Sequence, residues 1–262
     1  MTYKLGIIGG GALAESIIRG ICGKTFAASD IFVAECRKSR CEELSERFGV
    51  KTSLEADFLN EIGLLIVAVK PKDAKNVFSS LKNRISPSTI VSYTVAGLKL
   101  AEIEQFLPEN AIFRLMPNVA VSVGESMTAF APNSRVFDGA KDIIRQFWSN
   151  LGRVIEIDEV FMDAVTGLSG SSPAFAFLVI DSLADGGVAA GLPRKMAIEL
   201  AAQTIFGAAK MVLAGEHPDI LRDKVTSPAG TTIEGIRVLE RGAIRSHFIE
   251  AVLAAAEKSK SM

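Results

Sequence analysis

Gly6-Ile7-Ile8-Gly9-Gly10-Gly11-Ala12-Leu13-Ala14 is the stretch that decides the fold of this chain. It has the spacing G-x-G-x-x-A at Gly9, Gly11 and Ala14, between an apolar run and a helical pattern of apolar residues. This arrangement is typical of the first turn of a dinucleotide-binding domain. Gly9 would permit the tight turn, Gly11 the approach of a pyrophosphate, and Ala14 close packing of helix on strand. A glycine-rich turn also forms for purely structural reasons, but the context on both sides favours a cofactor.

Two further segments lie where a dinucleotide would extend. Glu35 follows an apolar run and stands where a carboxylate would hold the ribose hydroxyls of NAD. Arg37 and Lys38 could equally hold the 2′-phosphate of NADP, or could be ordinary surface charges. Lys70-Pro71 comes at the end of another apolar run, in the crevice where open α/β sheets bind ligands. We favour NADP(H) and leave NAD(H) open.

The residues that we expect to bind the cofactor are Gly9, Gly10, Gly11, Ala12, Leu13, Glu35, Cys36, Arg37, Lys38, Ala68, Val69, Lys70, Pro71, Ala96 and Asn118.

The chain changes its pattern near residue 157. Before that point, apolar runs rich in β-branched residues alternate with amphipathic stretches, which predicts a parallel sheet covered on both faces. The runs are residues 4–9, 30–35, 63–70, 88–94, 111–116, 126–132 and 153–157. After it, the segments are typical of helices. We therefore expect an α/β protein, with a Rossmann-like doubly wound domain over 1–157 and an all-helical dimerisation and substrate domain over 158–262.

The expected helix that begins at Pro173 is apolar almost all the way round for three turns. A helix without a polar face must be covered on all sides, and a helical region of this size offers few neighbours. We therefore expect a homodimer or a larger assembly of dimers, with residues 173–191 at the interface. The alternative is the central helix of a self-contained bundle.

Composition limits the other classes of function. The formal net charge is −1 and no stretch concentrates Lys and Arg, so nothing favours nucleic acid as a partner. The beginning of the chain lacks the pattern of a signal peptide, and Asp181 and Asp185 interrupt the longest apolar run, so we expect no membrane span. Three cysteines without a CxxC pair and two distant histidines predict no disulfide framework, metal site or serine–histidine triad. We expect a cytoplasmic protein.

An ordered set of motifs resembles the pyrroline-5-carboxylate reductase family. The set comprises GIIGGG (6–11), AVKP (68–71), MPN (116–118), AVTGLSGSSPAF (164–175), DSLADGGVAAGLPR (181–194), AAKMVL (208–213) and SPAGTTIEGIRVLERGAIRS (227–246). The resemblance implies a Rossmann domain, a helical domain that interlocks with that of a partner, and reduction of 1-pyrroline-5-carboxylate to L-proline with NAD(P)H. This reaction is the last step of proline biosynthesis.

The chain departs from the family pattern at several positions. Ala12-Leu13 replaces the usual Asn-Met, and Val119-Ala120 replaces the usual Thr-Pro. Phe175 stands where an aromatic alcohol is usual, so no catalytic tyrosine is carried over. Ala229 replaces one glycine of the usual SPGG. None of these changes removes a group that the reduction needs.

The turn 226–235 either merely starts a helix or holds a substrate. Thr231 and Glu234 fit a capping box, with Thr231 as the N-cap, and the N–H groups of such a helix start also suit a carboxylate. The resemblance implies that Thr232 is the catalytic hydroxyl and that Ser227 also contacts the substrate. Gly230 and Thr231 of the same turn are expected to bind the substrate as well.

Glu159 and Thr166 match family positions near the proline site; otherwise they read as an ordinary helix start and a buried helical threonine. Two alternative functions stay open, namely a related reductase of another cyclic imine carboxylate and a non-catalytic dinucleotide-binding protein. A small pocket discriminates one methylene by only ~1–3 kcal/mol.

Overall fold

The computed structural model describes residues 3–262 and divides them into two compact units. The first contains the residues up to Ser171 together with Ala254–Met262, and the second is Ser172–Leu253. The last strand ends at Glu156, close to the change of pattern in the sequence, and the segment from there to Ser171 packs with the sheet.

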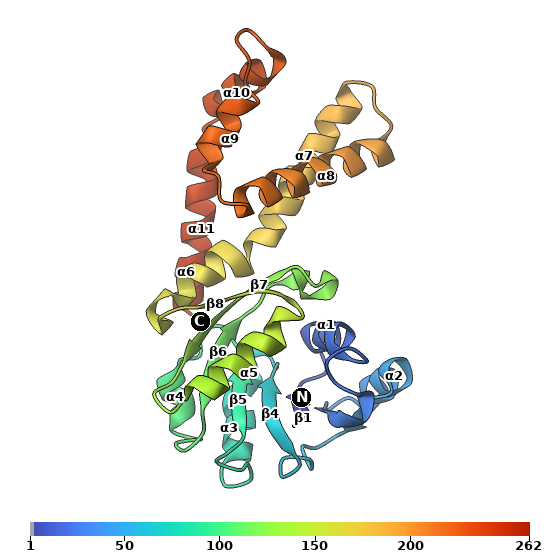
Figure 1. Ribbon diagram of the computed structural model, residues 1–262, viewed down its shortest axis with the longest axis vertical. Coiled ribbons are helices and arrows are strands. Elements are labelled where there is room, and N and C mark those ends of the chain that lie inside the picture. The colour runs from blue at the N-terminus through green and yellow to red at the C-terminus, as the bar shows by residue number, and fades with distance from the viewer. Residues whose placement is uncertain (1–2) are drawn as a thin grey trace. The chain divides into compact units, whose positions relative to one another are not determined.

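An eight-stranded sheet forms the centre of the first unit, in the order β3-β2-β1-β4-β5-β6-β7-β8 (Figure 1). The strands are β1 (Lys4–Ile8), β2 (Ile31–Ala34), β3 (Lys51–Ser53), β4 (Ile62–Val67), β5 (Ile90–Tyr93), β6 (Ile112–Met116), β7 (Ser126–Pro132) and β8 (Gly152–Glu156). Strands β1 to β6 are parallel to one another. The doubly wound Rossmann-like fold is therefore confirmed.

Two features of the sheet differ from the expectation. The short edge strand β3 was not expected, because Lys51-Thr52-Ser53 is polar and lacks the apolar run that marks a strand. β7 pairs antiparallel with β6, so the sheet is mixed. The connection 117–125 explains this direction, because a parallel crossover needs a dozen or more residues.

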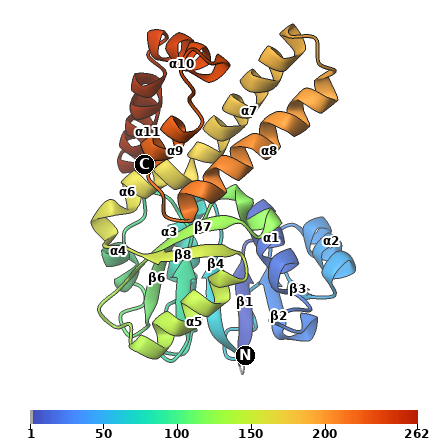
Figure 2. The same ribbon diagram turned by 45° about the horizontal axis from the view of Figure 1, so that its top comes forward.

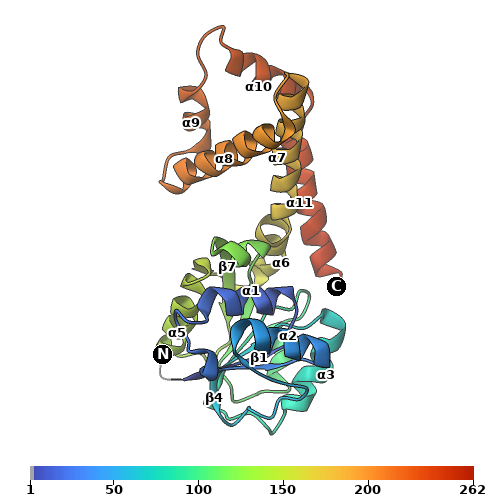
Figure 3. The same cartoon turned by 90° about the vertical axis from the view of Figure 1, so that its right-hand side faces the viewer.

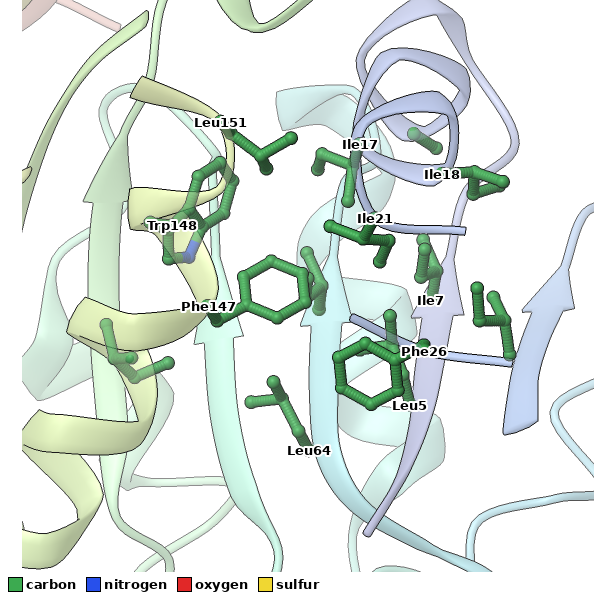
Figure 4. Close-up of a cluster of buried hydrophobic side chains, with 14 of the residues drawn as sticks. Leu5, Ile7, Ile17, Ile18, Ile21, Phe26, Leu64, Phe147, Trp148 and Leu151 are labelled. Atoms are coloured by element: carbon green, nitrogen blue, oxygen red, sulfur yellow. The ribbon is translucent and has the colours of Figure 1, made fainter. Parts of the chain in front are cut away.

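Helices cover both faces of the sheet because successive strand residues point to opposite sides. They are α1 (Ala12–Ile21), α2 (Lys38–Phe48), α3 (Pro71–Leu81), α4 (Leu100–Glu104) and α5 (Asp138–Ser149). On one face Ile7 packs with Ile17 of α1 and Phe147 of α5 (Figure 4). On the other face Ile8 belongs to a cluster with Phe78 of α3. Figure 2 shows α5 lying across the strands.

The strand order reverses between β1 and β4, which are hydrogen-bonded neighbours. Ligands of open α/β sheets bind in the crevice at such a switch point, outside the carboxyl ends of the strands. The glycine turn follows β1 directly, and the segment 68–71 follows β4. Both expected cofactor segments therefore meet at one place in the fold.

A short helical segment follows β8 and belongs to the first unit. It consists of the 3-10 turn Glu159–Phe161, the helix α6 (Met162–Val165) and the π-helical turn Thr166–Gly170. π-helical turns are rare and occur frequently at functional sites. This one coincides with the first half of the motif 164–175.

The second unit consists of helices and has a very small core of its own. Its helices are α7 (Ser172–Ala189), α8 (Arg194–Leu213), α9 (Pro218–Lys224), α10 (Thr231–Arg241) and most of α11 (Ile244–Lys260). α7 and α8 form a hairpin (Figure 2), seen from another side in Figure 3, and pack around the buried alanines 184, 197 and 201. Phe177 and Leu178 of α7 remain 61% and 66% exposed. A single copy thus leaves much of the apolar surface of α7 uncovered.

Two helical stretches, Glu159–Ala189 and Arg194–Leu213, are long and apolar enough by length and composition to cross a membrane. Both stretches contain charged residues, among them Asp181 and Asp185, so they pass by length and mean hydropathy and not as uninterrupted apolar runs. The core helices of a soluble protein pass the same test, so the finding assigns no membrane.

Candidate cofactor and substrate sites

Gly9 occupies a backbone conformation and a space that only glycine fills easily. Its φ is +98°, and a Cβ built there would lie 2.5 Å from the carbonyl oxygen of Ala68 at the end of β4. Its N–H donates to the carbonyl of Ala34 at the end of β2 (2.8 Å). The turn is therefore fixed against the ends of both strands that neighbour β1.

Gly11 faces open space. It is the N-cap of α1 without a side-chain hydrogen bond, and a Cβ built on it meets no atom within 4 Å. The first N–H groups of a helix and its dipole attract anions, and phosphates bind such ends. Ala14 is fully buried between α1 and the sheet, as expected from the motif. The turn and the start of α1 fit a pyrophosphate.

The carboxylate of Glu35 is buried and surrounded by donors. Its Oε1 accepts from the backbone N–H and Nε of Arg37 (3.0 and 2.9 Å), and its Oε2 accepts from the N–H of Gly10 (2.9 Å). The Sγ of Cys36 lies 3.4 Å from Oε1. Burial raises the pKa of this carboxyl, but the hydrogen bonds from Arg37, Gly10 and Cys36 outweigh it and lower the pKa to about 2. Glu35 is therefore an anion held by the protein itself.

The basic residues of the same segment are open to solvent. The side chains of Arg37 and Lys38 are 63% and 81% exposed, at the N-terminus of α2. Lys70 is also exposed, as the N-cap of α3, and Pro71 occupies the first turn of that helix. These positions fit the binding of a phosphate by charge and by a helix start.

The remaining expected cofactor residues lie along the carboxyl ends of β4, β5 and β6. Ala68 and Val69 follow β4, and Ala96 follows β5, all half-buried. Asn118 follows β6, where its Oδ1 accepts from the N–H of Ala120 (3.1 Å) and its Nδ2 donates to the carbonyl of Ser169 (3.2 Å). The Asn118 amide thus ties the end of β6 to the π-helical turn.

Glu159 and Thr166 make contacts with the protein in the same unit. The Oε1 of Glu159 accepts from Arg114 Nη1 (2.9 Å) and from the N–H of Leu100 (2.7 Å). Arg114 is almost fully buried in β6. The hydroxyl of Thr166 donates to the carbonyl of Met162 (2.8 Å). Both side chains are half-buried. An ordinary helix start at Glu159 and a helical threonine at 166, the alternatives to a substrate role, are enough to account for these bonds.

The expected capping box at the start of α10 is wrong. Gly230 is the N-cap, with φ −80° and ψ 173°, and no side chain caps this end. Thr231 is already the first helical residue, and Glu234 pairs with Arg237 (2.9 Å). The capping box does not form because the residue with extended backbone is Gly230, one position before the expected N-cap. Thr231 and Glu234 therefore each lie one position further into the helix than a capping box requires. The N–H groups of this helix start are consequently left without a side-chain acceptor, which favours an anion site.

The turn before α10 is tight. The N–H of Gly230 donates to the carbonyl of Ser227 (3.1 Å), and a Cβ at Gly230 would lie 2.3 Å from the Ser227 hydroxyl oxygen. Ala229 has φ +53°, a conformation that favours glycine, so the alanine that replaces a family glycine sits at the left-handed position. Thr232 is half-buried, whereas Ser227 and Thr231 are exposed. The structure thus brings Ser227 and Gly230 into one turn.

Arg40 is a residue of the cofactor region that sequence reasoning missed. Its Nε donates to the carbonyl of Gly10 (2.7 Å), and its Nη2 donates to Glu15 in the first turn of α1 (2.6 Å). No motif marks it, because an arginine in a helix of alternating charges is normally solvated. Among residues 3–262, no group of three or more His, Cys, Asp or Glu side chains could hold a metal ion.

A glycine turn at the switch point of a doubly wound sheet, followed by a helical unit, defines the class of Rossmann-fold dinucleotide-binding proteins. Comparison with known proteins agrees. The family model described as NADP oxidoreductase coenzyme F420-dependent matches residues 4–96. The model described as pyrroline-5-carboxylate reductase dimerisation matches residues 159–262.

Full-length relatives identify the family. The chain is 43% identical to pyrroline-5-carboxylate reductase of Synechocystis, over 100% of this chain and 99% of that protein. It resembles the solved structure of the Coxiella burnetii enzyme, with a TM-score of 0.91 and 32% identity, over 100% and 98% of the two chains. The Plasmodium falciparum enzyme, solved with NADP bound, has a TM-score of 0.89 and 29% identity, over 99% and 98%. The chain belongs to the pyrroline-5-carboxylate reductase family.

The structural role of Gly9 and the cofactor-binding role of Gly11 can be distinguished by experiment. Gly9→Ala should lower the free energy of unfolding by at least ~1–2 kcal/mol, because its φ is left-handed and its Cβ meets a carbonyl. Gly11→Val should cost at most about 1 kcal/mol as an N-cap change but weaken NADPH binding by on the order of tenfold or more. Urea unfolding and fluorescence titration measure the two effects. Unchanged NADPH affinity in folded Gly11→Val protein would refute the placement of the pyrophosphate.

Proposed function

We propose that this protein reduces 1-pyrroline-5-carboxylate to L-proline and thereby completes proline biosynthesis. The end-to-end relationship to the pyrroline-5-carboxylate reductases carries this proposal. The turn 227–232, which the family resemblance assigns to the substrate, is intact in its hydroxyls and forms a helix start without a side-chain cap. The proposed substrate is a small carboxylate with a ring imine, which needs an anion site and a hydroxyl near its nitrogen.

We infer that NADPH is the preferred cofactor and that NADH is the weaker alternative. NADPH supplies the hydride when it is bound. Arg37 and Lys38 offer exposed positive charge for a 2′-phosphate, while the carboxylate of Glu35 is already occupied by Arg37 and Gly10. The Plasmodium falciparum relative was solved with NADP, which supports the same preference. We propose no metal, because hydride transfer to an imine needs none.

The substrate residues act by binding and orientation. The N–H groups at the start of α10 would bind the substrate carboxylate, since this helix end has no side-chain acceptor. The hydroxyl of Thr232 would accept a hydrogen bond from the protonated imine nitrogen. One hydride added to the imine carbon then breaks the C=N π bond, and its electrons become the lone pair of the secondary amine. The chain's own contribution is charge stabilisation and alignment.

We propose a cytoplasmic location and a homodimer or an assembly of dimers. The thiols of Cys22, Cys36 and Cys41 are free, which suits a reducing compartment. The dimerisation model matches residues 159–262, and a second copy of the chain would cover the exposed apolar side chains of α7. Nucleic acid and membrane are not proposed as partners.

A direct assay tests the activity. The purified protein should oxidise NADPH in the presence of racemic 1-pyrroline-5-carboxylate and form L-proline, with kcat/KM higher for NADPH than for NADH. The six-membered cyclic imine carboxylate serves as the competing substrate, and a preference for it would favour the related-reductase alternative. Nucleotide binding without turnover of either imine would leave only a non-catalytic dinucleotide-binding protein.

Neighbouring threonines separate a substrate hydroxyl from a structural one. Thr232→Val should lower kcat/KM by roughly one to two powers of ten, because a lost hydrogen bond to a charged group is worth ~1.5–3 kcal/mol. Thr231→Val should change both turnover and stability little, since Thr231 is exposed and makes no cap. Steady-state kinetics and thermal unfolding of both variants provide the measurement. The reverse order of effects would show that the roles of the two hydroxyls are exchanged.

The assembly can be tested by placing charge on α7. Sedimentation of the native protein should give a multiple of the 27.9 kDa chain mass, at least a dimer, at micromolar concentration. Leu178→Glu should shift it to monomer or cause aggregation, because Leu178 lies in the uncovered apolar surface. Leu54→Glu, the same change at an exposed leucine of the first unit, is the control and should leave the mass unchanged. A stable native monomer would overturn the proposal.

A further inference from the structure

The backbone N–H and the backbone carbonyl of Gly10 are each held by a charged side chain from the segment after β2. The N–H of Gly10 donates to Glu35 Oε2 (2.9 Å), and its carbonyl oxygen accepts from Arg40 Nε (2.7 Å). Gly10 lies in the middle of the glycine turn and is buried. A Cβ at this position would lie 3.0 Å from Leu44 Cδ1 and 3.1 Å from Glu35 Cβ and Oε2, so Leu44 and Glu35 leave little room for a larger residue here.

Each of the three guanidinium nitrogens of Arg40 already has a partner in the protein. Besides the bond to Gly10, its Nη2 lies 2.6 Å from Glu15 and its Nη1 lies 2.6 Å from Glu43. Its side chain is only 13% exposed. Glu15 stands in the first turn of α1, directly after the glycine turn. Arg40 therefore connects α2 with the turn and with the start of α1, which is the expected pyrophosphate site.

The carboxylate oxygens of Glu35 also have their partners within the protein. Both of its oxygens accept bonds from Arg37 and Gly10, and its side chain is 7% exposed. A carboxylate offers about four lone-pair sites, so a ribose hydroxyl could bind only by displacing one of these donors. By contrast, Arg37 uses Nε and Nη2 toward Glu35 while most of its guanidinium remains accessible. The pair leaves donors of Arg37 for a phosphate.

We propose that Glu35 and Arg40 are positioning residues that clamp Gly10, and that Glu35 holds Arg37 for a 2′-phosphate instead of binding ribose hydroxyls. The clamp joins the segment that distinguishes NADP from NAD to the turn that binds the pyrophosphate. This inference rests on the proposed use of a nicotinamide dinucleotide, though not on the identity of the imine substrate. It makes Glu35 a determinant of affinity for both cofactors, where a ribose-binding carboxylate would favour NAD alone.

The test uses nucleotides that lack nicotinamide, so it needs no catalysis. Isothermal titration of the full-length protein with 2′-phospho-ADP-ribose and with ADP-ribose measures the affinities for the nicotinamide-free parts of NADP and of NAD. Glu35→Gln and Arg40→Lys should each weaken both ligands by about tenfold, because each loses charge-assisted bonds to the turn. Arg37→Gln should weaken only the ligand with the 2′-phosphate. Glu46→Gln, the same chemical change at another exposed glutamate of α2, should leave both affinities unchanged.

Hydrogen exchange of the unliganded protein gives a second readout. The Gly10 amide should exchange about tenfold faster in Glu35→Gln than in the native protein and in Glu46→Gln. Loss of affinity for ADP-ribose alone, with unchanged or tighter binding of the 2′-phosphate ligand, would show that Glu35 is a ribose acceptor and overturn the inference. Unchanged exchange of Gly10 would overturn it as well.

The design keeps this inference separate from the proposed function. If Glu35→Gln does not fold, the Arg40→Lys variant tests the inference, because it leaves the Glu35 carboxylate in place. It should still weaken the binding of both ligands and speed the exchange of the Gly10–Gly11 backbone amides. Native protein that binds both nucleotides but does not reduce the imine would contradict the proposed reaction and leave the clamp standing. Native protein that binds neither nucleotide would contradict the proposed cofactor and, with it, the ligand role of the clamp.

Discussion

The close approach of Gly9 to the end of β4 is the constraint on which the nucleotide-binding part of the molecule depends. A Cβ there would lie 2.5 Å from the carbonyl oxygen of Ala68, and the backbone is left-handed. Because the chain turns so tightly, α1 begins directly above the reversal of strand order between β1 and β4. Gly11 then faces open space, with the N–H groups of α1 behind it. One steric condition thus places the uncapped N-terminus of α1 at the switch point.

The helical unit obeys a different constraint. Its buried cluster consists of Ala184, Ala197 and Ala201, with Ile180 packed against it. Such small side chains bury little apolar surface, while larger ones such as Phe177 remain exposed. The turn that we propose to bind the substrate lies in this unit, so covering α7 and α8 with a second copy of the chain should stabilise the surroundings of that turn.

Several polar residues expected to touch a ligand are engaged by the protein. Asn118 bonds Ala120 and Ser169, Glu159 bonds Arg114 and Leu100, and Glu35 bonds Arg37 and Gly10. Each of these bonds ties a strand end or a loop to its neighbour. Side chains near a binding site often position the groups that make contact, and a sequence position does not distinguish the two roles.

The sequence alone determined the Rossmann-like fold, the glycine turn and the family, because apolar periodicity, glycine spacing and ordered motifs are local properties of the chain. It did not show β3, whose polar residues pair only because β2 lies beside them, nor the antiparallel β7. It assigned the cap of α10 to Thr231 instead of Gly230, because a one-residue shift depends on the backbone of the preceding turn. Only the tertiary structure brought Arg40 and Glu35 to Gly10, since those contacts join residues 25 and 30 positions apart.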